Sequence, residues 1–251
     1  MYRAVVFDLY DTLVVFRPQV PALEVAGTRY RSTMEWMAET VARELPAVEF
    51  GDFLRAVAET TTEIIRARPP EYLEVPSAER FRRVLLRLDY GRADLAEKAA
   101  CLSQVHMCHL AAQTELPAEH LALVQALAAR YPLGLVSNFD HGPTARAILA
   151  RHRLTDLFRS IVISDGFGRR KPHPAIFAEA LRQLGAAAAE ALFIGDSAVD
   201  DVAGASAAGM ATLWINARRE PLPDGVPAPT HTVTRLVAVA EILGIELQAL
   251  N

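Results

Sequence analysis

The sequence has little of four things that would narrow its class. It holds two cysteines, Cys101 and Cys108, in 251 residues, too few for a disulfide framework. No apolar run reaches the roughly 18 residues that a membrane-spanning helix needs. Lys plus Arg total 26 against 30 for Asp plus Glu, so the chain lacks the excess positive charge of a broad nucleic-acid-binding surface. Its 13 glycines and 15 prolines are too few for a low-complexity chain.

These absences predict a cytoplasmic protein with no membrane and no nucleic-acid partner. The first 13 residues do not read as a signal peptide, because Asp8 and Asp11 interrupt their apolar stretch. A net charge of −4 still allows a small phosphorylated substrate, which needs only a local site. Nothing in the sequence indicates the oligomeric state.

What is present is a globular composition with a clear α/β pattern. The length allows one large domain or two smaller ones, and a hydrophobic fraction of 51% is ordinary for a globular protein. Short apolar runs predict strands at residues 4–7, 133–136, 161–163 and 192–194, and we expect further strands at residues 212–215 and 231–233. Helical patterns separate most of these runs, so we expect a Rossmann-like core with a parallel sheet covered on both faces.

Residues 16–111 differ from the rest of the chain. They contain four helical patterns, at residues 38–45, 53–65, 78–88 and 95–110, and no convincing strand run. We therefore expect an all-helical cap domain at residues 16–111, inserted into a core made of residues 1–15 and 112–251.

Polar residues follow the predicted strands. Asp8, Ser137 and Asp196 each come at or just after the end of an apolar run, and Lys171 precedes a predicted helix start. Ligands of open parallel sheets bind outside the carboxyl ends of the strands. One such residue is commonplace as a turn or cap, but four in this order predict a site.

The ordered set resembles the four motifs of the haloacid dehalogenase superfamily. DLYDTL at residues 8–13 resembles the first motif, a nucleophilic Asp with Thr four positions later. Ser137-Asn138 resembles the second, Lys171-Pro172 the third, and GDSAVDD at residues 195–201 the acidic fourth. The resemblance spans the whole chain, including a cap inserted after the first motif, and implies a hydrolase.

The resemblance also implies a role for each residue. Asp8 would be the nucleophile and form a covalent intermediate that water hydrolyses. Thr12 and Ser137 would hydrogen-bond the transferring group, and Lys171 would neutralise charge on it. Beside these catalytic residues, Tyr10 and Asn138 are expected to bind substrate.

The same resemblance implies a Mg²⁺ site. Its ligands would be Asp8, Asp196, Asp201 and the backbone carbonyl of Tyr10, an all-oxygen set of the kind that Mg²⁺ prefers. We favour Asp201 over Asp200 because Asp201 directly precedes a helical stretch, as in relatives; Asp200 is the fallback.

Residue 10 departs from the phosphatase pattern. Phosphatases of the family carry a second Asp there, which protonates the leaving oxygen and activates water, whereas this chain has Tyr10. The 2-haloacid dehalogenases of the family carry Tyr at this position, but use no metal and lack an acid corresponding to Asp196. The favoured function is therefore a Mg²⁺-dependent phosphatase of a small phosphate ester. A 2-haloacid dehalogenase and a catalytically weak or non-enzymatic protein stay open as alternatives.

Overall fold

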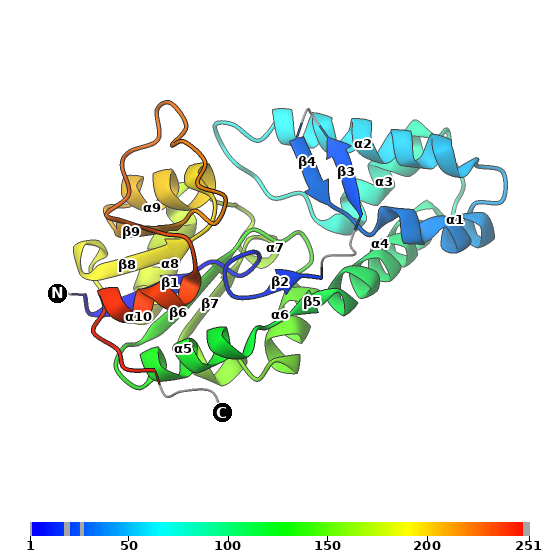
Figure 1. Cartoon of the computed structure of the whole chain (residues 1–251). Coiled ribbons are helices and arrows are strands. Elements are labelled where there is room, and N and C mark those ends of the chain that lie inside the picture. Colours follow the sequence, from blue (N-terminus) through cyan, green and yellow to red (C-terminus); the bar gives the residue numbers. More distant parts are fainter. Residues whose placement is uncertain (1, 18–20, 26–27, 248–251) are drawn as a thin grey trace. The chain divides into compact units, whose positions relative to one another are not determined.

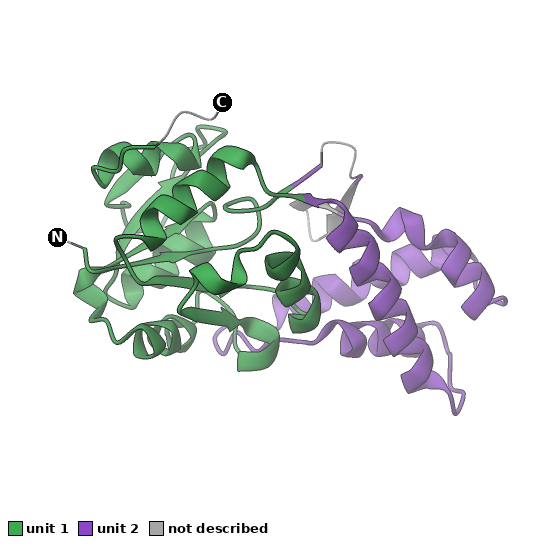
Figure 2. Ribbon diagram, turned by 90° about the horizontal axis from the view of Figure 1, so that it is seen from below, with its two compact units in different colours: residues 1–15, 115–251 green, residues 16–114 purple. Residues whose placement is uncertain are grey.

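The computed structural model of the chain describes residues 2–17, 21–25 and 28–247. The chain divides into two compact units (Figure 2). Unit 1 consists of residues 1–15 and 115–251, and unit 2 of residues 16–114. Both ends of the chain belong to unit 1, so unit 2 is inserted into it.

Unit 1 is built on a parallel six-stranded sheet in the order β10-β9-β8-β1-β6-β7. The strands are β1 (Ala4–Phe7), β6 (Leu133–Ser137), β7 (Ser160–Ile163), β8 (Ala191–Gly195), β9 (Ala211–Ile215) and β10 (His231–Val233). All six predicted strands are present, and the Rossmann-like α/β class is confirmed. Phe7 aligns with Leu135 on one neighbouring strand and with Ile194 on the other. The carboxyl ends of β8, β1 and β6 therefore meet at one edge of the sheet.

Helices cover both faces of this sheet (Figure 1). They are α5 (Ala118–Ala128), α6 (Gly142–Arg151), α7 (Ser164–Phe167), α8 (Pro174–Leu184), α9 (Gly204–Ala207) and α10 (Val239–Ile242). Short 3₁₀ turns lie at Thr155–Leu157, Ala188–Glu190 and Leu236–Ala238, and a π-helical turn at Ala198–Ala203. Side chains of successive strand residues face opposite sides of the sheet. On one side Phe177 of α8 packs against Phe193, with ring centroids 5.2 Å apart, and on the other Phe7 packs against Phe158 at 6.3 Å.

Unit 2 is mainly helical. It contains a 3₁₀ turn at Met34–Met37 and the helices α1 (Ala38–Glu44), α2 (Phe50–Arg66), α3 (Ser77–Arg87) and α4 (Leu95–Ala112). The apolar residues of α2 and α3 recur at helical spacing, which places them on one face of each helix. The stacked rings of Phe53 and Phe81, 6.3 Å apart, join these faces at the centre of a core that includes Val84 and Leu102.

The expectation that residues 16–111 are all helical is wrong in one place. Strands β3 (Ala22–Val25) and β4 (Thr28–Arg31) form an antiparallel pair there. Each strand has four residues, and the sequence of β4 contains two arginines and a threonine. Neither an apolar run nor a clear alternation of polar and apolar residues marks them, so periodicity could not find them.

The two connections between the units run side by side. Strand β2 (Val15–Phe16) pairs with β5 (Thr114–Glu115), and Arg17 N donates to Gln113 O at 2.9 Å. The second division of the chain lies between Thr114 and Glu115, three residues after the predicted boundary, because α4 continues to Ala112.

Two further observations bear on the setting of the protein. None of the helices among the described residues is long and apolar enough to span a membrane. Cys101 and Cys108 are free thiols. The cytoplasmic location stays a prediction.

Candidate active site

Asp8 directly follows the central strand β1. Its backbone N–H donates to Ile194 O at 2.9 Å, which continues the parallel ladder, and its side chain is buried. The chain then turns sharply, because Leu13 N and Val14 N both donate to Leu9 O at 2.9 Å and Asp11 adopts a φ of 58°. The segment after Asp8 is therefore not extended. The alternation of side chains expected for an extended segment, which would turn Asp11 away from the site, does not apply.

Lys171 joins two of the predicted acids. Its Nζ donates to Asp8 Oδ1 at 2.5 Å and to Asp201 Oδ1 at 2.7 Å, and it lies 5.4 Å from the centre of the Phe193 ring. Lys171 is 2% exposed and Asp201 1% exposed. A buried charge is tolerated only when it is paired and hydrogen-bonded, and this ammonium meets that condition through two carboxylates.

Three carboxylates gather around Lys171. Asp8, Asp196 and Asp201 each place one oxygen within 4.8 Å of the others. Asp201 is held by Ser197 N, which donates to its Oδ2 at 2.9 Å. A Cβ at residue 195 would lie 2.2 Å from that same oxygen. Gly195 is therefore needed for Asp201 to reach the group.

The turn that carries Asp201 is π-helical, rather than the start of a regular α-helix. Asp201 N and Val202 N both donate to Ser197 O, at 3.0 and 3.2 Å, and α9 begins only at Gly204. Single π turns are frequent at functional sites. Here the turn directs Asp201 toward Lys171, while Asp200 accepts a hydrogen bond from Asn138 Nδ2 at 3.2 Å.

The charges of this group do not balance. Burial raises the pKa of Asp8 to about 7 and that of Asp196 to about 8, and repulsion among the acids adds to both shifts. Asp11 is one of the residues that raise the pKa of Asp196, so its charge acts on the site. Although burial opposes the charged form of Lys171, the attraction of Asp201 and Asp8 raises its pKa. One ammonium thus compensates only part of three carboxylates.

This donor set fits a divalent cation. All of its ligand atoms are carboxylate oxygens, the kind that hard cations such as Mg²⁺ prefer. A cation would also remove the repulsion that raises the two carboxyl pKa values. The backbone carbonyl of Tyr10 stays a predicted ligand.

The hydroxyls of Thr12 and Ser137 are buried near Asp8 in the sequence and at the end of β6, respectively. Thr12 Oγ1 and Ser137 Oγ form no hydrogen bond with any residue that the structure describes, and both side chains are at most 1% exposed. Leaving a buried hydroxyl unpaired costs about 1–3 kcal/mol. Their place, four residues after Asp8 and at the end of β6, fits the predicted bonds to a transferring group.

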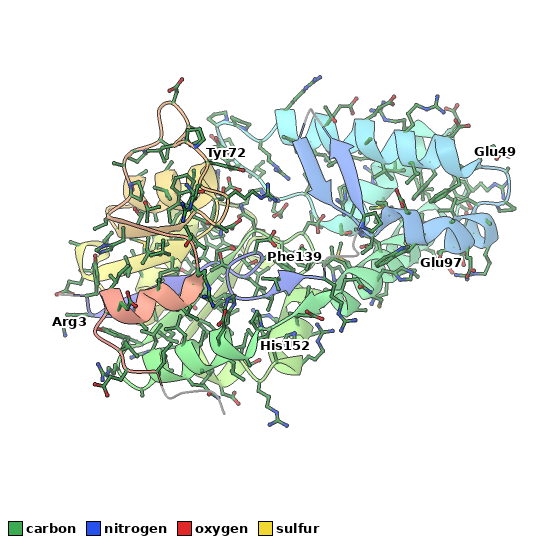
Figure 3. The ribbon with its side chains drawn as sticks, in the orientation of Figure 1. Arg3, Glu49, Tyr72, Glu97, Phe139 and His152 are labelled. Carbon is green, nitrogen blue, oxygen red and sulfur yellow. The ribbon has the colours of Figure 1, made fainter. Side chains whose placement is uncertain are left out.

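Asn138 makes contacts that the sequence did not predict, and its substrate-binding role stays a prediction. Its side-chain amide bonds to the backbone of Lys171 and to Asp200, contacts that a substrate-binding role did not anticipate. Tyr10 stacks on Phe139 (labelled in Figure 3), with ring centroids 4.8 Å apart and planes at 21°. Burial, followed by the charges of Asp140 and Asp8, raises the pKa of Tyr10 well above 10. Its phenol therefore stays protonated at neutral pH and cannot act as a base.

The roles of Phe139 and Ser197 were not predicted from the sequence. Ser197 Oγ accepts from Asp200 N at 3.1 Å, which caps the π turn. A serine three residues before an acidic helix start is a recognisable capping signal. Phe139 carried no such signal, because a lone aromatic after a strand reads as core.

Comparison with known proteins places the chain in a family. A sequence model of the haloacid dehalogenase-like hydrolases matches residues 2–209. The chain therefore belongs to this family of hydrolases, and the resemblance of its four motifs is confirmed.

Its relatives include phosphatases and dehalogenases. The glyceraldehyde 3-phosphate phosphatase of Pyrococcus abyssi is 30% identical over 214 residues, covering 85% of this chain and 81% of the relative. The phosphoglycolate phosphatase of Rhodospirillum rubrum is 41% identical over 128 residues, covering 48% of this chain and 52% of the relative. The structure of a 2-haloacid dehalogenase from Pseudomonas syringae is similar with a TM-score of 0.73 and 26% identity, covering 97% and 99% of the two chains.

Proposed function

We propose that this hydrolase is a Mg²⁺-dependent phosphatase of a small phosphate ester. The observation that carries the proposal is the group of Asp8, Asp196 and Asp201, three carboxylates within 4.8 Å with one ammonium between two of them. Phosphatase relatives that match 85% and 48% of the chain support the same proposal.

The chemistry would run through Asp8. Its carboxylate attacks phosphorus, the bond from phosphorus to the leaving oxygen breaks, and water then hydrolyses the aspartyl phosphate. Lys171 and the hydroxyls of Thr12 and Ser137 stabilise charge on the phosphoryl oxygens. Bound Mg²⁺ supplies positive charge that keeps the carboxylates ionised and polarises the phosphoryl group.

Tyr10 sets the leaving groups that such a site can handle. A phenol held protonated, with a pKa well above 10, does not replace a carboxyl group that gives and takes a proton near neutral pH. Esters whose leaving group is stable as an anion need no such proton. We therefore expect aryl phosphates to react faster than alkyl phosphates.

The second candidate function, that of a 2-haloacid dehalogenase, is supported by Tyr10. Halide leaves without a proton, so Tyr10 suits a 2-haloacid dehalogenase, and a dehalogenase from Pseudomonas syringae shares the fold at 26% identity. The partly buried acid Asp196 opposes it, because its negative charge and that of Asp8 repel each other unless a cation is bound, and this repulsion raises the pKa of Asp196.

The test is phosphate release from p-nitrophenyl phosphate and a panel of metabolite phosphates, with Mg²⁺ or with EDTA. Asp8→Asn should lower turnover by about 10⁴-fold or more, while Asp224→Asn, in an exposed loop, should not change it. Equal rates in EDTA or in Asp8→Asn would rule the proposal out. Halide release from short 2-haloacids without metal would establish the dehalogenase, and neither activity would indicate a non-enzymatic protein.

The role of residue 10 is tested by Tyr10→Asp. Restoring a carboxyl group should raise the rate on alkyl phosphates by about 10²-fold, with a smaller gain on aryl phosphates. Tyr10→Phe keeps the stacked ring and serves as the control. An unchanged alkyl rate in Tyr10→Asp would show that the missing acid does not limit the reaction.

A further inference from the structure

The Asn138 side chain spans the backbone of a residue 33 positions away. Its Oδ1 accepts from Lys171 N at 2.7 Å, and its Nδ2 donates to Lys171 O at 3.0 Å. The same Nδ2 donates to Asp200 Oδ2 at 3.2 Å. One amide thus connects the end of β6, the segment before α8 and the π-helical turn.

These contacts use the whole donor capacity of the amide. An asparagine side chain has two N–H groups and one carbonyl oxygen. Both N–H groups are engaged, one by Lys171 O and one by Asp200, and the carbonyl accepts from Lys171 N. No side-chain N–H is left for a substrate.

The residue that Asn138 holds is the cation of the site. Lys171 reaches Asp8 and Asp201 at the end of a flexible side chain with many accessible rotamers. Asn138 binds both the backbone N–H and the backbone carbonyl of Lys171. The Cα from which the Lys171 side chain extends is therefore held in one position. The bond to Asp200 also fixes the residue beside Asp201.

We propose that Asn138 is a positioning residue, which places Lys171 between Asp8 and Asp201 and does not contact substrate. The proposal replaces the predicted substrate-binding role. Its kinetic consequences rest on the proposed phosphatase function, whereas its structural consequence does not.

The chain offers a matched control at Asn216. The Asn216 side chain makes the same pair of bonds to one residue, donating to Glu220 O at 2.8 Å and accepting from Glu220 N at 2.9 Å. This pair is exposed in the loop after β9. Asn138→Ala and Asn216→Ala therefore both remove a pair of bonds to the backbone of one residue, and Asn138→Ala also removes the bond to Asp200. Only the first variant affects the support of Lys171.

The kinetic test compares kcat and KM on aryl and alkyl phosphates. Asn138→Ala should lower kcat by about 10- to 100-fold, as loss of a supporting hydrogen bond does, by the same factor for every substrate and with KM nearly unchanged. Asn216→Ala should change kcat less than twofold. A rise in KM that differs between substrates would show substrate contact and overturn the proposal.

The structural test does not depend on activity. Crystal structures of Asn138→Ala and Asn138→Asp should show Lys171 Nζ displaced from at least one of the two carboxylates. Asn138→Asp is the milder change in volume, keeps the acceptor for Lys171 N and loses both donors. Lys171 retained at both carboxylates in each variant would overturn the proposal, even if the wild-type protein releases no phosphate.

Discussion

The two units bury their polar side chains in different ways. Unit 1 buries the charged side chains of Asp8, Lys171 and Asp201 together. In the described part of unit 2, the buried polar side chains are uncharged at neutral pH, namely Thr33, Thr40, Thr60, Ser77, Ser103, His106 and Thr114. His106 belongs to this set because burial, followed by the charge of Arg80, lowers its pKa to about 3.

The difference shows where the fold carries chemistry. Removing charges from water costs several kcal/mol per ion, and replacing a buried ion pair with apolar residues is often stabilising. Unit 2 follows that rule, with its ion pairs outside the core, as between Arg82 and Glu79. Unit 1 departs from it at one place. A buried charged group without structural benefit is best explained by its use in a reaction.

The largest expected effect contrasts a lysine from each unit. Lys171→Met leaves Asp8 and Asp201 buried without their cation, so phosphate release should fall by about 10²–10³-fold. The free energy of unfolding of the EDTA-treated variant should be about 3–5 kcal/mol lower than that of the EDTA-treated wild-type protein. Lys98→Met removes the partner of Glu44, 2.6 Å away in unit 2, and should leave activity unchanged and the melting temperature nearly so. Equal effects of the two changes, measured by kinetics and thermal unfolding, would remove the distinction between the units.

The next effect contrasts a glycine from each unit. In Gly195→Ala the new methyl group would meet Asp201 Oδ2 at 2.2 Å, so the Mg²⁺-dependent rate should fall by about 10²-fold, with weaker Mg²⁺ activation. At Gly51, in the exposed first turn of α2, nothing lies within 4 Å of an added Cβ. Gly51→Ala should raise the free energy of unfolding by up to about 1 kcal/mol. A Gly195→Ala enzyme with normal Mg²⁺ activation would show that Asp201 does not need the space that the missing side chain of residue 195 leaves.

The smallest effect is a pH dependence of stability. Asp8 and Asp196 keep their protons up to pH values of about 7 and 8 in the folded protein, against 3.8 for an ordinary Asp. The folded state then binds more protons than the unfolded state, so the metal-free protein should lose stability as the pH rises from about 4 to 8. Mg²⁺ at 100 times its dissociation constant should restore about 2.7 kcal/mol, and more effectively at pH 8 than at pH 5.

His106 predicts the opposite trend for unit 2. Its folded pKa of about 3 lies below the ordinary value of 6.5, so its contribution is present above pH 6.5 and is lost as the pH falls toward 3. In thermal unfolding, the His106→Gln variant should lose less stability than the wild-type protein as the pH falls.

For the acidic group of Asp8, Asp196 and Asp201, the contradicting result would be a metal-free, EDTA-treated protein whose stability does not change from pH 5 to 8.

Much of the fold and part of the site could be read from the sequence. The central strands β1, β6 and β8 are buried, mainly apolar runs, and parallel topology then brings residues such as Asp8 and Ser137 to one edge. The preference for Asp201 over Asp200 agrees with the acidic group that the structure brings together, although no residue pattern indicated the π-helical turn. The contact of Asn138 could not be predicted, because its partner is the backbone of Lys171. A peptide group is the same at every position, so no residue pattern indicates which backbone a side chain will bind.

The paired connections make unit 2 a long loop between two hydrogen-bonded neighbours. Strands β2 and β5 pair in a two-stranded sheet of their own, so the 99 residues from 16 to 114 begin and end at neighbouring strands. Loop-closure entropy grows with the logarithm of length, by about 0.6 kcal/mol per doubling. In evolution, an insert joined in this way can be lengthened, shortened or exchanged for another domain. The segment that carries Asp8 is then left in place.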